Sequence, residues 1–511
     1  MCTYAIGFRY SIGYIVTSTI SPSVLASKDP SINEKFAIFS QFTTTIILIQ
    51  RIINLLTGTA LGEWGQVIGR KKLVFIAVIG YAVGSLAMLL GYLTSKPYKW
   101  EECYNPCAAK VTNVTGGGIE ACVATCVTET KGDGSHFNGE AFYWISQGII
   151  GFCAPFSITA SSFAVDSSTT EKSFVENFAY MRAWGYGGGL SFGYFWGLVL
   201  LIVFYLGMKN TAAFLTATFI FGIVFGLIGV AFAGLKLKEP LKEDQKKKCC
   251  ANPADYMFWN SLIFPFKMGK YTLFLYLTNG MYAFYIAYWE STALEYFLWN
   301  YGVNALMVFI AVILIFAMQL VGIKVLVPRL GFRRAIYFGI PMLVTGVSIL
   351  AFTVRGPNDT ATSQPTGIMV VIFGGICAAG QGMVQSSTLA LYNSQGGKQD
   401  TGPIGGAWKT GEAFFKLMGS ICAAAFYPGH VRRVGADSSI LPGIHWIIFG
   451  FPAIILLITF FIVADQCYGD LAKEQKYQED VIIFGWGATA KKGLDNVATA
   501  KNVEVADSID K

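Results

Sequence analysis

Charged side chains inside long apolar stretches are the residues of this chain with the clearest capacity for chemistry. Lys409, Glu412 and Lys416 are spaced three and four residues apart in the apolar stretch 405–427, so they share one face of a helix. One carboxylate cannot neutralise two ammonium groups, and this face could therefore bind an anionic group. A locally neutralised ladder of charges is the alternative interpretation.

Other apolar stretches also contain polar groups. An ionisable group at membrane depth costs about 2.5–3.5 kcal/mol on insertion scales, so such groups are expected to bind a solute, a proton or one another. Glu290 and Glu412 are the carboxylates that could titrate. The predicted substrate or proton cavity comprises Arg51, Asn279, Tyr282, Glu290, Gln381, Gln385, Glu412 and Lys416.

The elements that position these residues are predicted to be membrane-spanning helices. The 511 residues are 54% hydrophobic and only 14% charged, whereas soluble domains contain about 25% charged residues. This composition excludes an ordinary soluble enzyme, a disordered protein and a nucleic-acid binder. The apolar runs are continuous, which favours helices over a barrel. Twelve stretches are long enough to span a bilayer: 4–25, 38–61, 73–93, 142–165, 183–207, 212–235, 271–291, 303–327, 335–353, 367–390, 405–427 and 442–464.

The charged segment 236–270 divides these stretches into two sets of six. It predicts a cytoplasmic linker between an N-terminal bundle (1–235) and a C-terminal bundle (271–464), followed by a cytoplasmic tail (465–511). With the N-terminus inside, most loop lysines and arginines lie on the inner side, as the positive-inside rule requires. The first stretch lacks a basic leader and a cleavage site, so it is predicted to be a retained span.

The loop 96–141 lies outside in this topology and is rich in cysteine. Two disulfides, with the pairing open, are the favoured interpretation outside the cytosol; a zinc site is the alternative. Both glycosylation sequons also fall in outside loops. These cysteines are Cys103, Cys107, Cys122 and Cys126, and the sequons begin at Asn113 and Asn358.

Two short basic loops occupy corresponding positions in the two halves, GEWGQVIGRKK at 62–72 and VPRLGFRR at 327–334. Together with AVDSSTTEKS at the end of the fourth stretch, the first loop resembles signature motifs of the major facilitator superfamily. Gln66 and Val67 stand where the family motif has Asp and Arg. The resemblance implies a cytoplasmic gate motif of Gly62, Gly69, Arg70, Lys71, Asp166 and Arg333. The pair Trp289-Glu290 and the segment DTGPIGGAWKTGEAF resemble the tetracycline-resistance and hippocampus-abundant-transcript branch.

The resemblance implies an all-α membrane protein of twelve transmembrane helices, arranged in two pseudo-symmetric six-helix bundles. It also implies alternating access, in which the bundles rock about a central site. Arg70 is expected to contact Asp166 or the inner end of a neighbouring helix when the inner side is closed. The charged groups within the spans sum to +2, which favours a small anionic or zwitterionic solute. Both proton coupling and uniport are open, and a non-transporting scaffold, receptor or chaperone on the same fold is the alternative function.

No Walker loop, dinucleotide fingerprint or His-Cys-carboxylate cluster occurs in the sequence. We therefore predict no enzyme activity, no cofactor, no metal and no nucleic-acid partner. The predicted partners are a small-molecule solute, the lipid bilayer and, if transport is coupled, protons; the chain is predicted to be a monomer. The plasma membrane and an endolysosomal or vacuolar membrane are both consistent with sequons and cysteines outside.

Overall fold

The computed structural model describes residues 32–94, 135–154, 188–200, 211–241, 257–297, 327–353, 364–393, 401–436 and 444–475, with scattered positions at 162–181, 202–203, 246 and 310–317. Every element within these ranges is a helix. Helices satisfy all their backbone hydrogen bonds internally, so this is the architecture that long apolar stretches adopt in lipid.

The N-terminal half contains five of the described helices. They are α2 (Ile32–Val67), α3 (Arg70–Thr94), α6 (Ser135–Cys153), α9 (Gly188–Leu200) and α10 (Thr211–Leu235). Helix α3 packs on both α6 and α10, and α2 packs on α6. The outer face of α3 carries a stripe of exposed aliphatic side chains at a spacing of three and four residues, which suits contact with lipid. This stripe consists of Ile76, Ile79, Val83, Leu86 and Leu90.

The C-terminal half contains the other six. They are α11 (Phe258–Met268), α12 (Lys270–Phe297), α14 (Val327–Thr353), α15 (Gln364–Asn393), α16 (Thr401–Ala436) and α17 (Ile444–Gln475). Helix α12 is central to this half because it packs on α15, α16 and α17, while α14 packs on α15 and α17. The buried side chains of these helices form one core rich in tyrosine.

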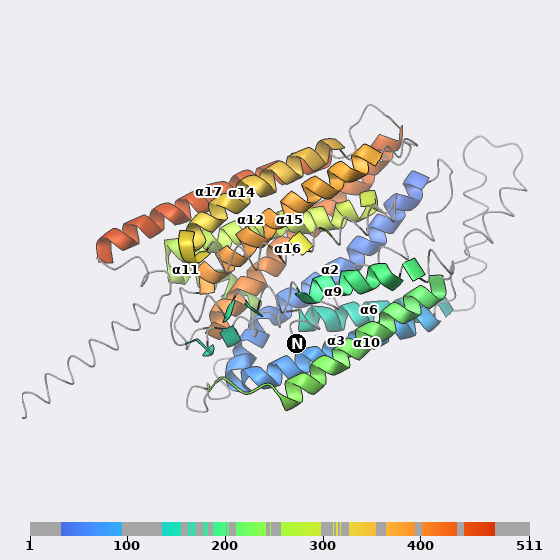
Figure 1. Ribbon diagram of the computed structural model, residues 1–511, viewed down its shortest axis with the longest axis horizontal. Coiled ribbons are helices and arrows are strands. Elements are labelled where there is room, and N and C mark those ends of the chain that lie inside the picture. Colours follow the sequence, from blue (N-terminus) through green and yellow to red (C-terminus); the bar gives the residue numbers. More distant parts are fainter. Residues whose placement is uncertain are drawn as a thin grey trace, which may run out of the picture.

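The two halves lie side by side with their long helices running along the length of the molecule (Figure 1). Their main contact is between α2 of the N-terminal half and α16 of the C-terminal half. Helix α11 also contacts both halves, through α2 on one side and through α12 and α16 on the other. Three helical segments within the described residues are long and apolar enough to cross a membrane: Arg70–Gly91, Thr216–Leu235 and Ile444–Cys467.

The helices broadly follow the apolar stretches expected from the sequence, but several extend into segments predicted as loops: α2 continues to Val67, α14 begins at Val327 and α16 runs from Thr401 to Ala436. Two further differences concern the predicted linker and the predicted tail. The segment 236–270 was expected to be a solvated linker throughout, but it contains α11, whose Trp259, Ile263 and Phe266 are exposed apolar residues. Helix α17 continues to Gln475, into the segment predicted as a tail. Apolar side chains in 258–268 explain the first difference, because that part of the linker is far less charged than 236–248.

Several predictions concern residues outside the described part of the chain. These are the first stretch at 4–25, most of the eighth at 303–327, the cysteines Cys103, Cys107, Cys122 and Cys126, the sequons at Asn113 and Asn358, and the tail beyond 475. They stay predictions.

Candidate functional site

The contact between the two halves is built on small residues. Gly58 of α2 lies so close to α16 that an added Cβ would stand 2.8 Å from Thr410 Oγ1. The hydroxyls of Thr59 and Thr410 share a hydrogen bond of 3.1 Å, and both residues are almost completely buried. Gly406 faces the backbone of Gly58 and Thr59. Small residues let two helix backbones approach closely, and we call this contact the α2–α16 seam.

Arg51 joins the same two helices two turns before Gly58 along α2. It is 8% exposed and lies on α2. Its guanidinium donates to the backbone carbonyl of Lys416 at 2.7 Å and to the hydroxyl of Ser420, both on α16. A charged donor that satisfies two acceptors on the opposite bundle holds the seam together. These contacts are structural, and the cavity role expected for Arg51 stays a prediction.

Lys409, Glu412 and Lys416 form a continuous ion-pair ladder along α16. The carboxylate of Glu412 lies 2.5 Å from Lys409 Nζ and 2.8 Å from Lys416 Nζ. The Glu412 side chain is 7% exposed, whereas that of Lys416 is 26% exposed. The carboxylate is thus shared by both ammonium groups, and the ladder keeps a net charge of +1. Lys416 is the member that solvent or a solute reaches most easily.

The other residues of the predicted cavity are packed to different degrees. Asn279 and Tyr282 are each 2% exposed on α12, so they lie inside the C-terminal half in this conformation. Gln381 and Gln385 are half-buried on α15. Glu290 lies within α12, but its side chain is outside the described part of the structure. The described contacts therefore bring together Arg51, Glu412 and Lys416.

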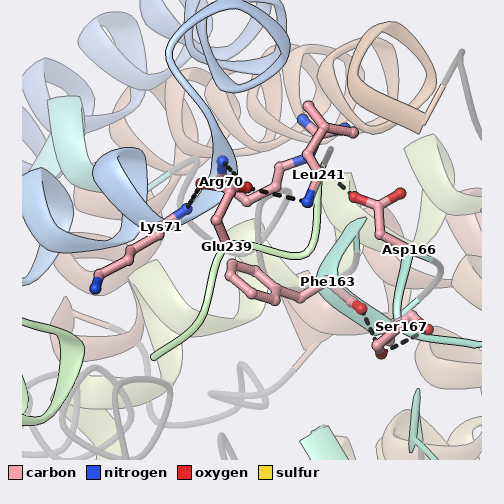
Figure 2. A network of polar contacts seen from close by, with 8 residues as sticks. Arg70, Lys71, Phe163, Asp166, Ser167, Glu239 and Leu241 are labelled. Carbon is pink, nitrogen blue, oxygen red and sulfur yellow. Dashed lines mark hydrogen bonds and ion pairs between the residues drawn. The ribbon is translucent and has the colours of Figure 1, made fainter. Parts of the chain in front are cut away.

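At the inner end of the N-terminal half, Arg70 contacts Asp166 as expected (Figure 2). Arg70 Nε donates to Asp166 Oδ2 at 3.2 Å, and the two side chains are 2% and 5% exposed. A pair this buried is costly to break, because removing one partner leaves a buried charge behind. Arg70 belongs to α3 and Asp166 to the end of the fourth predicted stretch, so this ion pair lies within one bundle.

Figure 2 also shows Glu239, a residue that the sequence analysis did not single out. Its carboxylate accepts hydrogen bonds from the backbone N–H groups of Arg70 and Lys71, each at 2.9 Å. These N–H groups open α3, where a carboxylate is favoured by the exposed donors and the helix dipole. The site requires Gly69 at φ 96°, since a Cβ there would lie 2.5 Å from the Glu239 carboxylate.

The corresponding loop of the C-terminal half has a related arrangement. Arg333 on α14 forms an ion pair with Asp465 on α17. Tyr337 donates a hydrogen bond to the same carboxylate at 3.1 Å. The side chains of this cluster are partly exposed, so solvent weakens their contact more than it weakens that of Arg70 with Asp166. It too joins two helices of one bundle.

The residues of the predicted gate motif and the residues that join the two bundles make separate sets of contacts. The described ion pairs of Arg70 and Arg333 hold each bundle together, whereas the α2–α16 seam and Arg51 join the bundles. The signal for the seam was present in the sequence as small residues in GTALG and GPIGGAWKTG, but such residues do not reveal their partner. Glu239 gave a weaker signal, because it is one acid within a lysine-rich run.

Comparison with solved structures finds the same arrangement of helices in several transporters. The human organic anion transporter MFSD10 (TETRAN) matches with a TM-score of 0.59 at 13% identity, over 91% of this chain and 97% of that one. The xylose transporter XylE from E. coli, in a partially occluded inward-open conformation, has a TM-score of 0.54 at 13% identity, over 89% and 94%. The nucleoside transporter NupG has a TM-score of 0.50 at 13% identity, over 90% and 98%.

By sequence the chain matches no family model and no curated protein. The structural similarity nevertheless covers nine-tenths of the chain in each comparison. A match of that extent shows that the chain shares the fold of these transporters.

Proposed function

Because this chain has the major facilitator fold, we propose that it is a secondary transporter that moves a small anionic or zwitterionic solute by alternating access. The observation that carries the substrate class is the excess of cations at the contact between the bundles. Lys409 and Lys416 flank the carboxylate of Glu412, and Arg51 donates to the backbone carbonyl of Lys416 one helix away. The solute is expected to place its anionic group near Lys416.

The physical reason is the cost of an unbalanced charge in a low-dielectric region. Two ammonium groups that share one carboxylate attract an anion more strongly there than at the protein surface. Lys416 shares Glu412 with Lys409 and is the most exposed member of the ladder. A purely cationic solute would be repelled by the same group. MFSD10, which is similar in fold, is described as an organic anion transporter, and this is consistent with the proposal.

The transport cycle requires the α2–α16 seam to separate and close again. In the closed seam, Thr59 bonds to Thr410 and Arg51 to Ser420. These are a few polar contacts between closely packed small residues, so they can be exchanged for water and solute contacts when the bundles rock. The ion pairs Arg70–Asp166 and Arg333–Asp465 keep each bundle rigid during that motion.

The second part of the proposal concerns the coupling of transport to protons. Glu412 is engaged by two lysines, which makes it a poor proton carrier unless the ladder rearranges. Glu290 is therefore the stronger candidate for the carboxylate that carries the proton. A chain whose carboxylates do not titrate during the cycle would operate as a uniporter. We further propose that the protein is a monomer of the plasma membrane or of an endolysosomal or vacuolar membrane.

Uptake by purified protein in liposomes tests the function. A pooled mixture of anionic, zwitterionic and cationic metabolites is offered, and the contents are read by mass spectrometry with and without an inward proton gradient. We expect enrichment of anions or zwitterions. Dependence on the gradient would establish proton coupling, and its absence would establish a facilitator.

Two variants make the test specific for the ladder. Lys416→Gln removes the accessible cation and should lower uptake of the anion by about tenfold or more, as expected for the loss of one charge-assisted contact. Lys72→Gln removes an exposed lysine from α3 and should leave uptake unchanged. Enrichment of cations alone would contradict the substrate class. No enrichment by folded protein would favour the scaffold or receptor alternative.

A further inference from the structure

The outer end of the C-terminal half contains a cluster of titratable groups that the proposed function does not use. The chain has only three histidines, and two of them meet here, His430 on α16 and His445 on α17. Their ring centroids are 4.9 Å apart. His445 is 3% exposed, and its Nδ1 shares a hydrogen bond of 3.0 Å with the hydroxyl of Tyr288 on α12.

The surroundings of the two imidazoles are aromatic. Tyr427 and Trp446 lie 5.0 and 5.3 Å from His445, measured between ring centroids. The titratable groups near the pair in the described residues include Tyr288 from α12 and Tyr427 from α16, and Cys422 of α16 interacts with Tyr288. Arg432, Arg433 and Glu290 are close in sequence to the cluster, and their side chains lie outside the described part.

Imidazole is the side chain that titrates in the physiological range, so two adjacent imidazoles form a natural receptor for protons. A first proton leaves the pair with one positive charge, which the flanking aromatic rings stabilise by cation–π contact. A second proton places two charges about 5 Å apart and is strongly opposed. Groups coupled this closely titrate as a pair, in two separate steps.

We propose that His430 and His445 form a proton-binding pair, through which the pH of the outer compartment controls the C-terminal bundle. One histidine belongs to α16 and the other to α17, so a proton gained by the pair changes the contact between the ends of these two helices. Helix α16 also carries the Lys409–Glu412–Lys416 ladder and its side of the α2–α16 seam. The effect on transport rests on the proposed function, but proton binding by the pair does not.

Nuclear magnetic resonance of histidine-labelled full-length protein in nanodiscs tests proton binding directly. His136→Gln removes the third imidazole, so the remaining signals belong to the pair. We expect the two steps to be separated by about two pH units, as two unit charges about 5 Å apart produce at an effective dielectric constant of about 20. His445→Gln should reduce the titration of His430 to one step.

Tyr288→Phe serves as a second variant because the buried His445 could be needed for folding. It removes the hydrogen bond to Nδ1 while retaining the ring, and it should alter the titration of His445 and leave that of His136 unchanged. Independent single-step titrations in the wild-type protein, or a His430 titration that is unaffected by His445→Gln, would overturn the proposal. Loss of both signals on adding Zn²⁺ at equimolar concentration would assign the pair to a metal instead.

Uptake measured against outer pH tests the control of transport. The initial rate should change by about tenfold across the titration of the pair, as is typical of coupling between two sites. His430→Gln should flatten this dependence, while His136→Gln should preserve it. An unchanged pH profile in His430→Gln would refute control by the pair. Absence of any uptake would count against the proposed function, and the resonance titration would still decide whether the pair binds protons.

Discussion

Replacing Gly58 by alanine should shift the balance between the closed and the separated α2–α16 seam. The new Cβ would stand 2.8 Å from Thr410 Oγ1, well inside normal contact, with the Thr410 backbone nitrogen at 3.4 Å. Overpacking of this kind costs about 1–3 kcal/mol. The cost applies to the closed seam alone, so the equilibrium should move by about 5- to 150-fold toward separated bundles.

Distances between the inner ends of the bundles measure this shift. Spin labels introduced through an unnatural amino acid at Lys72 on α3 and Arg334 on α14, both exposed, report the separation by pulsed electron resonance. Gly58→Ala should populate longer distances. Gly234→Ala is the matched control, because its Cβ would meet Phe75 at an ordinary 3.5 Å while gaining the same helix propensity.

The double variant Gly58→Ala/Thr410→Ala identifies the contact responsible. Removing the Thr410 hydroxyl and methyl group clears the space that the new Cβ needs, so the distance distribution should return toward that of Thr410→Ala alone. The reasoning is refuted if Gly58→Ala leaves the distances unchanged, or if the double variant shows the same shift as Gly58→Ala.

Four further substitutions probe the contacts of Arg70 and Glu239 and the two sequons. Arg70→Ala leaves the buried carboxylate of Asp166 without its ion-pair partner and should lower the free energy of unfolding by about 3–5 kcal/mol. We expect a lower thermal midpoint and slower transport, with surface expression retained. Normal turnover and normal stability would contradict a structural role for this ion pair. Glu239→Gln removes the charge at the start of α3 but keeps one oxygen acceptor. It should lower the free energy of unfolding by about 0.5–1 kcal/mol, measured by thermal unfolding beside the wild type. Equal thermal midpoints would argue against a capping role for Glu239. Asn113→Gln and Asn358→Gln should each remove a glycosidase-sensitive increment of mass from protein made in eukaryotic cells, and no change would place those loops elsewhere or leave the sequons unused.

Much of the fold follows from the sequence because each apolar stretch encodes its helix locally. The charge ladder was also predictable, since residues three and four apart on one helix must meet whatever surrounds them. Arg70 and Asp166 could be paired because both belong to motifs that resemble a known family. These predictions depend on short-range spacing or on residues whose partners the resemblance supplies.

The contacts between distant segments were not predictable in the same way. Thr410 and Gly406 are small residues whose partners on α2 the sequence does not identify. The sequence placed Arg51 in a cavity but did not identify Ser420 and the Lys416 carbonyl as its partners. The histidine pair depends on two helices meeting at their outer ends. Small and polar residues of these kinds occur in many helices, so their type alone does not identify their partners. Only the tertiary structure shows which residues they contact.

The segment that joins the two bundles is attached to them at two places, and the length of chain between these places determines how far it can extend. It is held at Glu239, on the start of α3, and again from α11, which packs on both halves. The chain between them, from 242 to 257, has a contour length of about 50 Å, several times the diameter of a helix, about 10 Å. If the bundles rock as proposed, a segment of that contour length is long enough not to limit the motion. The amplitude would then be set where the helices touch, and shortening the segment by several residues should leave transport unchanged.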